Sequence, residues 1–266
     1  MAVKLVALDI DGTIVPPGND WTVMPSAEIA DAVRVLNKAG VAVILASGRM
    51  FPGTVSVARH LGLDTPLVCQ QGASVHRLDG SLLHNLPIDA RIAREIAGFA
   101  RDLDRLYAWF NAVRYVASAK NKASEEYGRV SGIEPEYHEH PEDAGLEPTG
   151  VDIISSAPEA AHIHRILVHR YSEQLHILDF PSVTVAVAAD ANKGHALSML
   201  SADLAIDRAD VVAIGDSVND APMLAWAGRS VAMPHADRYA RDAADEILPG
   251  EGLEAMAGFL LSLIAR

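Results

Sequence analysis

The sequence predicts an α/β protein: a doubly wound parallel sheet, interrupted by an inserted α+β domain. Two observations support this class. Apolar runs alternate with helical patterns near both ends of the 266-residue chain, which is the order of a parallel sheet with helical crossovers. These runs are continuous rather than alternating, as expected for strands that helices cover on both faces.

The first predicted core segment, residues 1–85, contains three buried strands with helices between them. A helical pattern opens at Ser26 and closes near Gly40. A second helix is predicted over 53–61. The strands are predicted at residues 3–8, 41–46 and 66–69. The strand–helix order of this segment is that of a parallel sheet.

The same alternation returns in the second predicted core segment, residues 189–266. Lys193-Gly194 opens a helix, and a short apolar strand ends at Gly215-Asp216. The helices are predicted at residues 193–200, 221–227 and 252–264, and the strands at 210–214 and 229–232. Both core segments are therefore expected to form one sheet.

Between these halves, residues 86–188 have a different organisation and are predicted to form the inserted domain. A hairpin that turns at Asp79-Gly80 precedes them. A polar stretch over 125–140, rich in Glu and His, is interpreted as a solvated face. Helices are predicted at residues 89–102 and 158–171, and strands at 107–111, 113–117, 151–155, 175–179 and 183–187.

Composition excludes several function classes. The net charge of -13 argues against a broad basic face for nucleic acid. One cysteine, Cys69, permits no disulfide within the chain. Charged Asp9 interrupts the N-terminus too early for a signal peptide, and no apolar run approaches the ~20 residues of a membrane helix. We expect a cytoplasmic monomer or small homo-oligomer, with neither nucleic acid nor membrane as partner.

Two carboxylates directly follow the first strand, in Asp9-Ile10-Asp11-Gly12-Thr13. An unperturbed Asp has a pKa of about 3.9, so Asp9 would be an anion that can attack phosphorus. Asp11 could give a proton to the leaving alcohol and later take one from water. A turn or helix cap is the alternative interpretation. A calcium loop does not fit, because an EF-hand needs glycine at its sixth position and a late glutamate.

Two weaker signals accompany this segment. Ser47-Gly48-Arg49 ends the second strand, where a hydroxyl and backbone N–H groups can bind phosphate oxygens. Lys193 at a helix start can neutralise phosphate and a charged nucleophile. Alone, a serine before a glycine is more often only a turn, and most lysines are solvated surface residues.

A fourth polar segment, Gly215-Asp216-Ser217-Val218-Asn219-Asp220, follows an apolar strand. In open parallel sheets, ligands bind at the carboxyl ends of the strands, so segments far apart in sequence converge there. Magnesium prefers few carboxylates among near-octahedral oxygen ligands, which Asp9 and Asp216 from neighbouring strands would supply. A helix N-cap is the alternative interpretation of this segment.

Together, the order and spacing of the four segments resemble the haloacid dehalogenase superfamily of phosphatases. The series Asp-x-Asp-Gly-Thr, Ser-Gly-Arg, Lys-Gly and Gly-Asp-x-x-Asn-Asp-x-x-Met-Leu is similar to its Cof-like subgroup, whose members carry a large α/β cap (type IIB). The last motif is complete here from Gly215 to Leu224. The inserted domain would be this cap.

The resemblance implies a Mg²⁺-dependent phosphatase that acts on a small phosphorylated metabolite, such as a sugar phosphate, through an aspartyl-phosphate on Asp9. Asp11 would be the general acid and base, and Lys193 would bridge phosphate and Asp9. Magnesium would be held by Asp9, Asp216 and the backbone carbonyl of Asp11. Phosphate contacts would come from Asp11, Gly12, Ser47, Gly48, Lys193 and Asn219, and supporting contacts from Thr13 and Asp220.

One departure from the subgroup concerns the third strand, which Cof-like members usually follow with Asn-Gly-Ala. Here the segment is Gln71-Gly72-Ala73. Gln71 and Arg49 are candidate substrate contacts in the core, and Trp109 and Arg114 are candidates in the insert. Packing is the alternative for the insert residues, because aromatic side chains on strands usually pack.

Two other function classes stay open at this point. A phosphomutase or phosphotransferase would pass the phosphate to a second sugar rather than to water. A non-catalytic regulatory binding protein could use the same scaffold, but such a protein is expected to have lost some of Asp9, Asp11, Lys193 and Asp216. All four are present.

Overall fold

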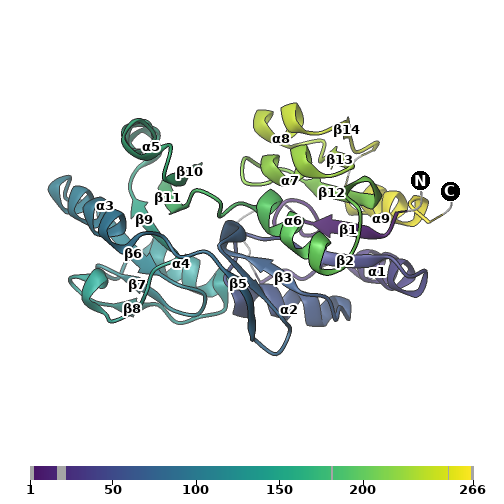
Figure 1. Cartoon of the computed structure of the whole chain (residues 1–266), viewed down its shortest axis with the longest axis horizontal. Helices are drawn as coiled ribbons and strands as arrows, with labels where there is room; N and C mark the ends of the chain where they lie inside the picture. The colour runs from purple at the N-terminus through teal and green to yellow at the C-terminus, as the bar shows by residue number, and fades with distance from the viewer. Residues whose placement is uncertain (1–2, 17–21, 181, 251, 265–266) are drawn as a thin grey trace. The chain divides into compact units, whose positions relative to one another are not determined.

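The computed structural model describes residues 3–16, 22–180, 182–250 and 252–264. The chain divides into two compact units (Figure 1). Unit 1 combines the described residues of 1–83 and 192–266, and unit 2 comprises those of 84–191. Unit 2 is therefore an insertion between the two halves of unit 1, and its residue range includes the predicted insert of 86–188.

Unit 1 contains a five-stranded parallel sheet with β1 in its interior. The strand order is β14-β13-β12-β1-β2, and every neighbouring pair is parallel. All residues of β1 and β12 are buried, as the continuous apolar runs predicted. The strands are β1 (Leu5–Leu8), β2 (Ala42–Leu45), β12 (Val211–Gly215), β13 (Arg229–Ala232) and β14 (Glu246–Ile247). The predicted fold class is confirmed.

A second sheet of order β3-β4-β5 continues from β2. A parallel bridge joins Ala46 to Val68, and Val68 O also accepts from the N–H of Ser47 at 2.9 Å. The predicted hairpin is present, with its turn at residues 77–81. The strands are β3 (Leu67–Cys69), β4 (Ser74–His76) and β5 (Leu82–Asn85), with the short 3₁₀ segment η1 (Gln70–Gly72) between the first two.

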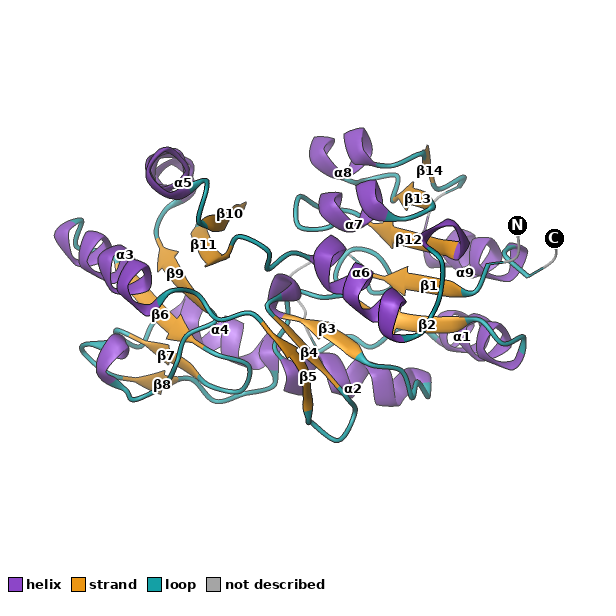
Figure 2. Cartoon of the chain, in the orientation of Figure 1, coloured by secondary structure: helices purple, strands orange, loops and turns teal. Residues whose placement is uncertain are grey.

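Among the helices of unit 1, α1 packs against α9 and α2, and α7 packs against α6 and α8 (Figure 2). These helices are α1 (Ala27–Lys38), α2 (Phe51–Leu61), α6 (Lys193–Asp203), α7 (Ala221–Trp226), α8 (Arg238–Ala243) and α9 (Gly252–Ser262). The Asn192 side chain caps α6 by accepting from the N–H of His195 at 2.9 Å. This cap sets Lys193 as the first residue of the helix. The sequence analysis did not predict α8 or β14.

The described residues of unit 2 form a six-stranded sheet of order β10-β11-β9-β6-β7-β8 and the α-helices α3, α4 and α5. Its core joins α3 and α5 to the sheet through side chains such as Ile96, Leu167 and Ile153. No helix in the described part of the chain is long and apolar enough to span a membrane. The elements are α3 (Ala90–Asp102), β6 (Leu106–Phe110), β7 (Tyr115–Ala117), α4 (Lys122–Ser131), β8 (Glu136–Tyr137), β9 (Gly150–Ile154), α5 (Ala157–Tyr171), β10 (Leu175–Phe180) and β11 (Val183–Ala188).

The glutamates and histidines of the polar stretch over 125–140 are exposed or half-buried, as expected of a solvated face, but the first part of the stretch belongs to helix α4, which was not predicted. Asn121 begins α4 with a reciprocal capping box, accepting from the N–H of Ser124 at 2.7 Å. Gly132 ends it with a φ of 67°. The ring of Tyr127 lies 4.5 Å from that of Tyr115. Caps and one aromatic contact therefore hold a helix that has few apolar residues.

Asp152 places a carboxyl group in the interior of unit 2. It lies on β9 between core residues Val151 and Ile153, so its side chain points to the opposite face of the sheet. It is 3% exposed, and among the described residues its Oδ1 has no hydrogen-bond partner. Burial raises the pKa of Asp152 to about 7, against a smaller opposing effect of the Tyr115 hydroxyl. Ionising Asp152 therefore disfavours the folded state.

We expect Asp152→Asn to stabilise the protein at pH 8 and to change its stability little at pH 4. The pKa of Asp152 in the folded state lies above the unfolded value of about 3.9, so the folded state holds this proton more tightly. The protein loses this contribution to its stability as pH rises through about 7 and the buried carboxyl ionises. The asparagine variant avoids this loss, which can reach about 4 kcal/mol for a shift of this size. Melting temperatures at both pH values test this, with exposed Asp31→Asn as the control. An equal change in the melting temperature of Asp152→Asn at pH 4 and at pH 8 would contradict this expectation.

Candidate active site

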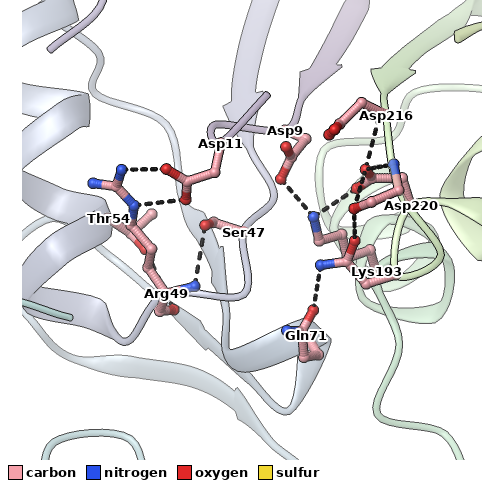
Figure 3. Close-up of polar contacts among 11 residues, drawn as sticks. Asp9, Asp11, Ser47, Arg49, Thr54, Gln71, Lys193, Asp216 and Asp220 are labelled. Atoms are coloured by element: carbon pink, nitrogen blue, oxygen red, sulfur yellow. Dashed lines mark hydrogen bonds and ion pairs between the residues drawn. The ribbon is translucent and has the colours of Figure 1, made fainter. Parts of the chain in front are cut away.

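The four polar segments singled out in the sequence meet within unit 1, at the carboxyl ends of its strands (Figure 3). Asp9 follows β1, and its N–H donates to Ile214 O of β12 at 3.0 Å, so it extends the strand. Asp216 follows β12 and Ser47 follows β2 by two residues. Lys193 enters from the start of α6. Parallel pairing thus brings together residues that lie about two hundred positions apart in the chain.

Lys193 is the centre of the polar network. Its side chain is fully buried, and Nζ donates to Asp9 Oδ1 and to Asp220 Oδ1, both at 2.6 Å. The second oxygen of Asp220 accepts from the N–H groups of Asp216 at 2.9 Å and Ser217 at 3.0 Å. Asp220 therefore fixes both the ammonium group and the loop that carries Asp216.

Negative charge exceeds positive charge in this cluster. Burial, followed by the charge of Asp220, raises the pKa of Asp9 well above its usual range, although Lys193 opposes this. Burial and Asp220 also raise the pKa of Asp216 to about 7. Burial alone would lower the pKa of Lys193, but the carboxylates of Asp220 and Asp9 outweigh it and raise that pKa. Three carboxylates around one ammonium group leave an excess of negative charge that favours a second cation.

The donor set fits a divalent cation. One oxygen each from Asp9, Asp216 and Asp220 lie within 4.8 Å of one another. Both oxygens of Asp220 already accept hydrogen bonds, whereas Asp216 Oδ1 is buried and has no partner among the described residues. Asp9 and Asp216 are therefore the better ligands, and carboxylate oxygens suit Mg²⁺. The ring of His235, which sequence analysis missed, lies 3.7 Å from Asp216 Oδ2.

Gly12 allows the loop after β1 to approach Asp216. Its φ is 92°, which a side chain disfavours, and a Cβ at this position would lie 2.3 Å from Asp216 Oδ2. Its N–H donates to Val15 O at 3.0 Å in this structure, and the phosphate contact of Gly12 stays a prediction. Thr13 is fully buried, and its hydroxyl has no hydrogen-bond partner among the described residues, so its support of the Asp11 loop stays a prediction.

Asp11 pairs with Arg49 rather than with the Lys193 network (Figure 3). Arg49 Nε donates to Asp11 Oδ2 at 2.8 Å, and a second guanidinium nitrogen contacts Oδ1. Arg49 is 3% exposed and Asp11 retains 26% side-chain exposure. Arg49, a candidate substrate contact in the sequence analysis, therefore has Asp11 as its partner in this structure. Sequence spacing gave no sign of this pairing across 38 residues.

Ser47, Asn219 and Gln71 line the other side of the site. Ser47 is fully buried, and its Oγ accepts from the N–H of Arg49 at 3.1 Å. Its hydroxyl hydrogen can still be donated to a ligand. Asn219 Nδ2 donates to Gln71 Oε1 at 2.7 Å. Gln71 therefore belongs to this site, through a contact with Asn219.

The two candidates in unit 2 have other partners. Trp109 is 1% exposed, and its indole N–H donates to Leu146 O at 3.1 Å. The ring belongs to the core of unit 2, which favours the packing alternative over a substrate contact. Arg114 binds both carboxylate oxygens of Glu136 at 2.7 Å, an ion pair that ties β7 to β8.

Comparison with known proteins relates the whole chain to one family. Residues 6–259 match the family model of haloacid dehalogenase-like hydrolases. The chain is 30% identical over 262 residues to the phosphoglycolate phosphatase of Methanopyrus kandleri, covering 98% of this chain and 97% of that protein. It is 27% identical over 272 residues to phosphatase YwpJ of Bacillus subtilis, covering 92% and 94%. A haloacid dehalogenase-like hydrolase from Bacteroides thetaiotaomicron shares the fold, with a TM-score of 0.84 at 20% identity over 98% of this chain and 99% of that structure.

Proposed function

Because this chain belongs to the haloacid dehalogenase-like hydrolases and is a phosphatase of the Cof-like type, we propose that it hydrolyses a small phosphorylated metabolite with Mg²⁺, through an aspartyl-phosphate on Asp9. The observation that carries the proposal is the placement of Asp9. Its carboxylate is buried at the end of a central strand, 2.6 Å from a buried lysine and close to Asp216. A nucleophile for phosphorus needs this combination of fixed position and nearby positive charge.

In the first step, an Asp9 oxygen attacks phosphorus, the new O–P bond forms, and the ester P–O bond breaks. Asp11 gives its proton to the departing alkoxide, which leaves as an alcohol. In the second step, water attacks the phosphorus of the aspartyl-phosphate and Asp11 takes the proton from that water. The bond between the Asp9 oxygen and phosphorus breaks, which releases inorganic phosphate and regenerates Asp9. For both steps the Asp11 carboxyl must turn from Arg49 toward the reacting oxygens.

The other residues would bind the phosphoryl group and stabilise its charge. Lys193 neutralises Asp9 and a phosphate oxygen, while the Ser47 hydroxyl, the backbone N–H groups of Asp11 and Gly48, and the Asn219 amide donate hydrogen bonds. Asp9, Asp216 and the backbone carbonyl of Asp11 would hold Mg²⁺, which when bound supplies charge neutralisation at the transferring phosphoryl group.

The substrate class is proposed as sugar phosphates and similar small phosphate esters. One support is that a relative of 30% identity over nearly the full chain is a phosphatase of phosphoglycolate, a small phosphorylated acid. The acidic chain, with a net charge of -13, also makes a polyanionic substrate a poor match.

We expect phosphate release from a panel of sugar phosphates and other small phosphate esters to require Mg²⁺. We also expect Mg²⁺ to raise the melting temperature of the wild type, because the cation binds the folded site. Asp216→Asn should lose both effects, whereas Asp31→Asn, which alters an exposed carboxylate, should keep both. Free phosphate assays and thermal melts with and without Mg²⁺ measure the outcomes. Phosphate passed to a second sugar without free phosphate, or Mg²⁺ stabilisation kept in Asp216→Asn, would contradict the proposal.

A further inference from the structure

The segment that follows β3 has an unusual backbone. Gln70, Gln71 and Gly72 have φ values of 51°, 62° and 101°, so three successive residues occupy the left-handed region. For the two glutamines this conformation is disfavoured, because the Cβ comes too close to the following carbonyl oxygen. Such strain persists where the surrounding structure enforces it, and it concentrates at functional sites.

The backbone contacts of this segment tie it to two parts of the phosphate-binding site. The N–H of Gln71 donates to Ser47 O at 3.2 Å, and the N–H of Gln70 donates to Arg49 O at 2.9 Å. On the other side, a Cβ at Gly72 would lie 2.3 Å from Asn192 O, next to Lys193. The segment therefore sits between the Ser47 loop and the start of α6.

The side chain of Gln71 reaches a third part. Its Oε1 accepts from Asn219 Nδ2 at 2.7 Å, while Asn219 Oδ1 accepts from the Ser217 hydroxyl at 2.6 Å. The carboxamide of Asn219 is thus held at both ends. Its Nδ2 carries a second N–H, which remains for another acceptor. A Cβ at Gly48 would lie 2.4 Å from Gln71 Nε2, so the glycine leaves room for the glutamine amide.

We propose that Gln71 is a positioning residue of this phosphatase: it orients the Asn219 carboxamide so that the second N–H of Nδ2 binds the phosphoryl group. This inference rests on the proposed phosphate contact of Asn219. The backbone strain at Gln71 is the structural cost of aiming its side chain at Asn219.

The test compares Gln71→Leu, which keeps the size of the side chain but removes the acceptor, with Gln71→Gly, which also relieves the positive φ. Both should raise KM for p-nitrophenyl phosphate, and weaken binding of inorganic phosphate in calorimetry, by about 5- to 20-fold. The kcat should change less, because the contact serves bound phosphate before and during reaction. Gln71→Gly should melt at the wild-type temperature or higher, which separates its effect on binding from any loss of folding.

A double-mutant cycle with Asn219→Ala decides whether Gln71 acts through Asn219. We expect Asn219→Ala to weaken phosphate binding, and Gln71→Leu to add less than about 2-fold in that background. Gln174→Leu, at an exposed position in unit 2, is the matched control and should leave both constants unchanged. Normal phosphate binding by Gln71→Leu, or full additivity of the two substitutions in the cycle, overturns the inference about Gln71 but leaves the proposed role of Asn219 intact. Normal binding by Asn219→Ala overturns the inference together with the proposed role of Asn219.

Discussion

Asp9→Asn is expected to abolish phosphate release while leaving the fold intact. An amide has no anionic oxygen to attack phosphorus, so the loss should be at least about 10³-fold in kcat. The folded state should tolerate the change, because the amide has nearly the same shape and removes one of the crowded carboxylates that burial and Asp220 already disfavour. Without Mg²⁺, the melting temperature should stay the same or rise. Phosphate release, circular dichroism and thermal melting measure these outcomes.

Two controls make this result specific. Asp31→Asn repeats the chemical change at an exposed position and should retain full activity. Mass spectrometry of the assayed Asp9→Asn sample should show an intact amide, because deamidation would regenerate the nucleophile. Turnover above about 1% of wild type with the amide intact would exclude the covalent mechanism on Asp9.

Lys193→Met is expected to remove activity and also to destabilise the metal-free protein. Lys193 is fully buried and pairs with Asp9 and Asp220, so its loss leaves buried carboxylates without a cation. Breaking a buried ion pair by removing one partner costs about 3–5 kcal/mol. Urea unfolding without Mg²⁺ measures the change, and phosphate release with saturating Mg²⁺ shows whether the metal alone can replace the ammonium group.

The double variant Lys193→Met, Asp220→Asn separates the two effects. Removing the charge of Asp220 should restore much of the lost stability, while activity stays absent because Asp9 and phosphate still lack the ammonium group. Lys38→Met, in the exposed last turn of α1, is the matched control and should behave as wild type. A stable Lys193→Met protein would show that the buried carboxylates take up protons instead, and full activity would exclude Lys193 from the reaction.

The core strands and the meeting of Asp9, Lys193 and Asp216 could be predicted from the sequence. Each signal is local: an apolar run defines a strand, and the polar residue after it must lie at the carboxyl end of a parallel sheet. The helix starts at Ser26 and Asn192 also depend only on nearby residues, because each cap accepts a hydrogen bond from within the first turn.

The remaining features depend on side-chain directions and on contacts between distant segments. The pairing of Asp11 with Arg49 depends on a rotamer, so the acidic motif alone could not show that Asp11 points away from Asp9. Helix α4 escaped prediction because its caps and one tyrosine contact replace an apolar stripe. The strain at Gln70 and Gln71 is enforced by neighbours that the sequence places far away.

The interior position of β1 has a consequence for biosynthesis. β1 ends at Leu8, but its neighbour β12 begins only at Val211, so about two hundred residues are translated between the two strands. At normal rates of synthesis this leaves one edge of β1 without its strand for roughly 10 to 40 seconds. Unit 2 is continuous in the chain and can be completed on the ribosome before β12 is synthesised. An open edge invites pairing with other chains, so we expect chaperone protection of the nascent segment that contains β1 to limit aggregation during synthesis.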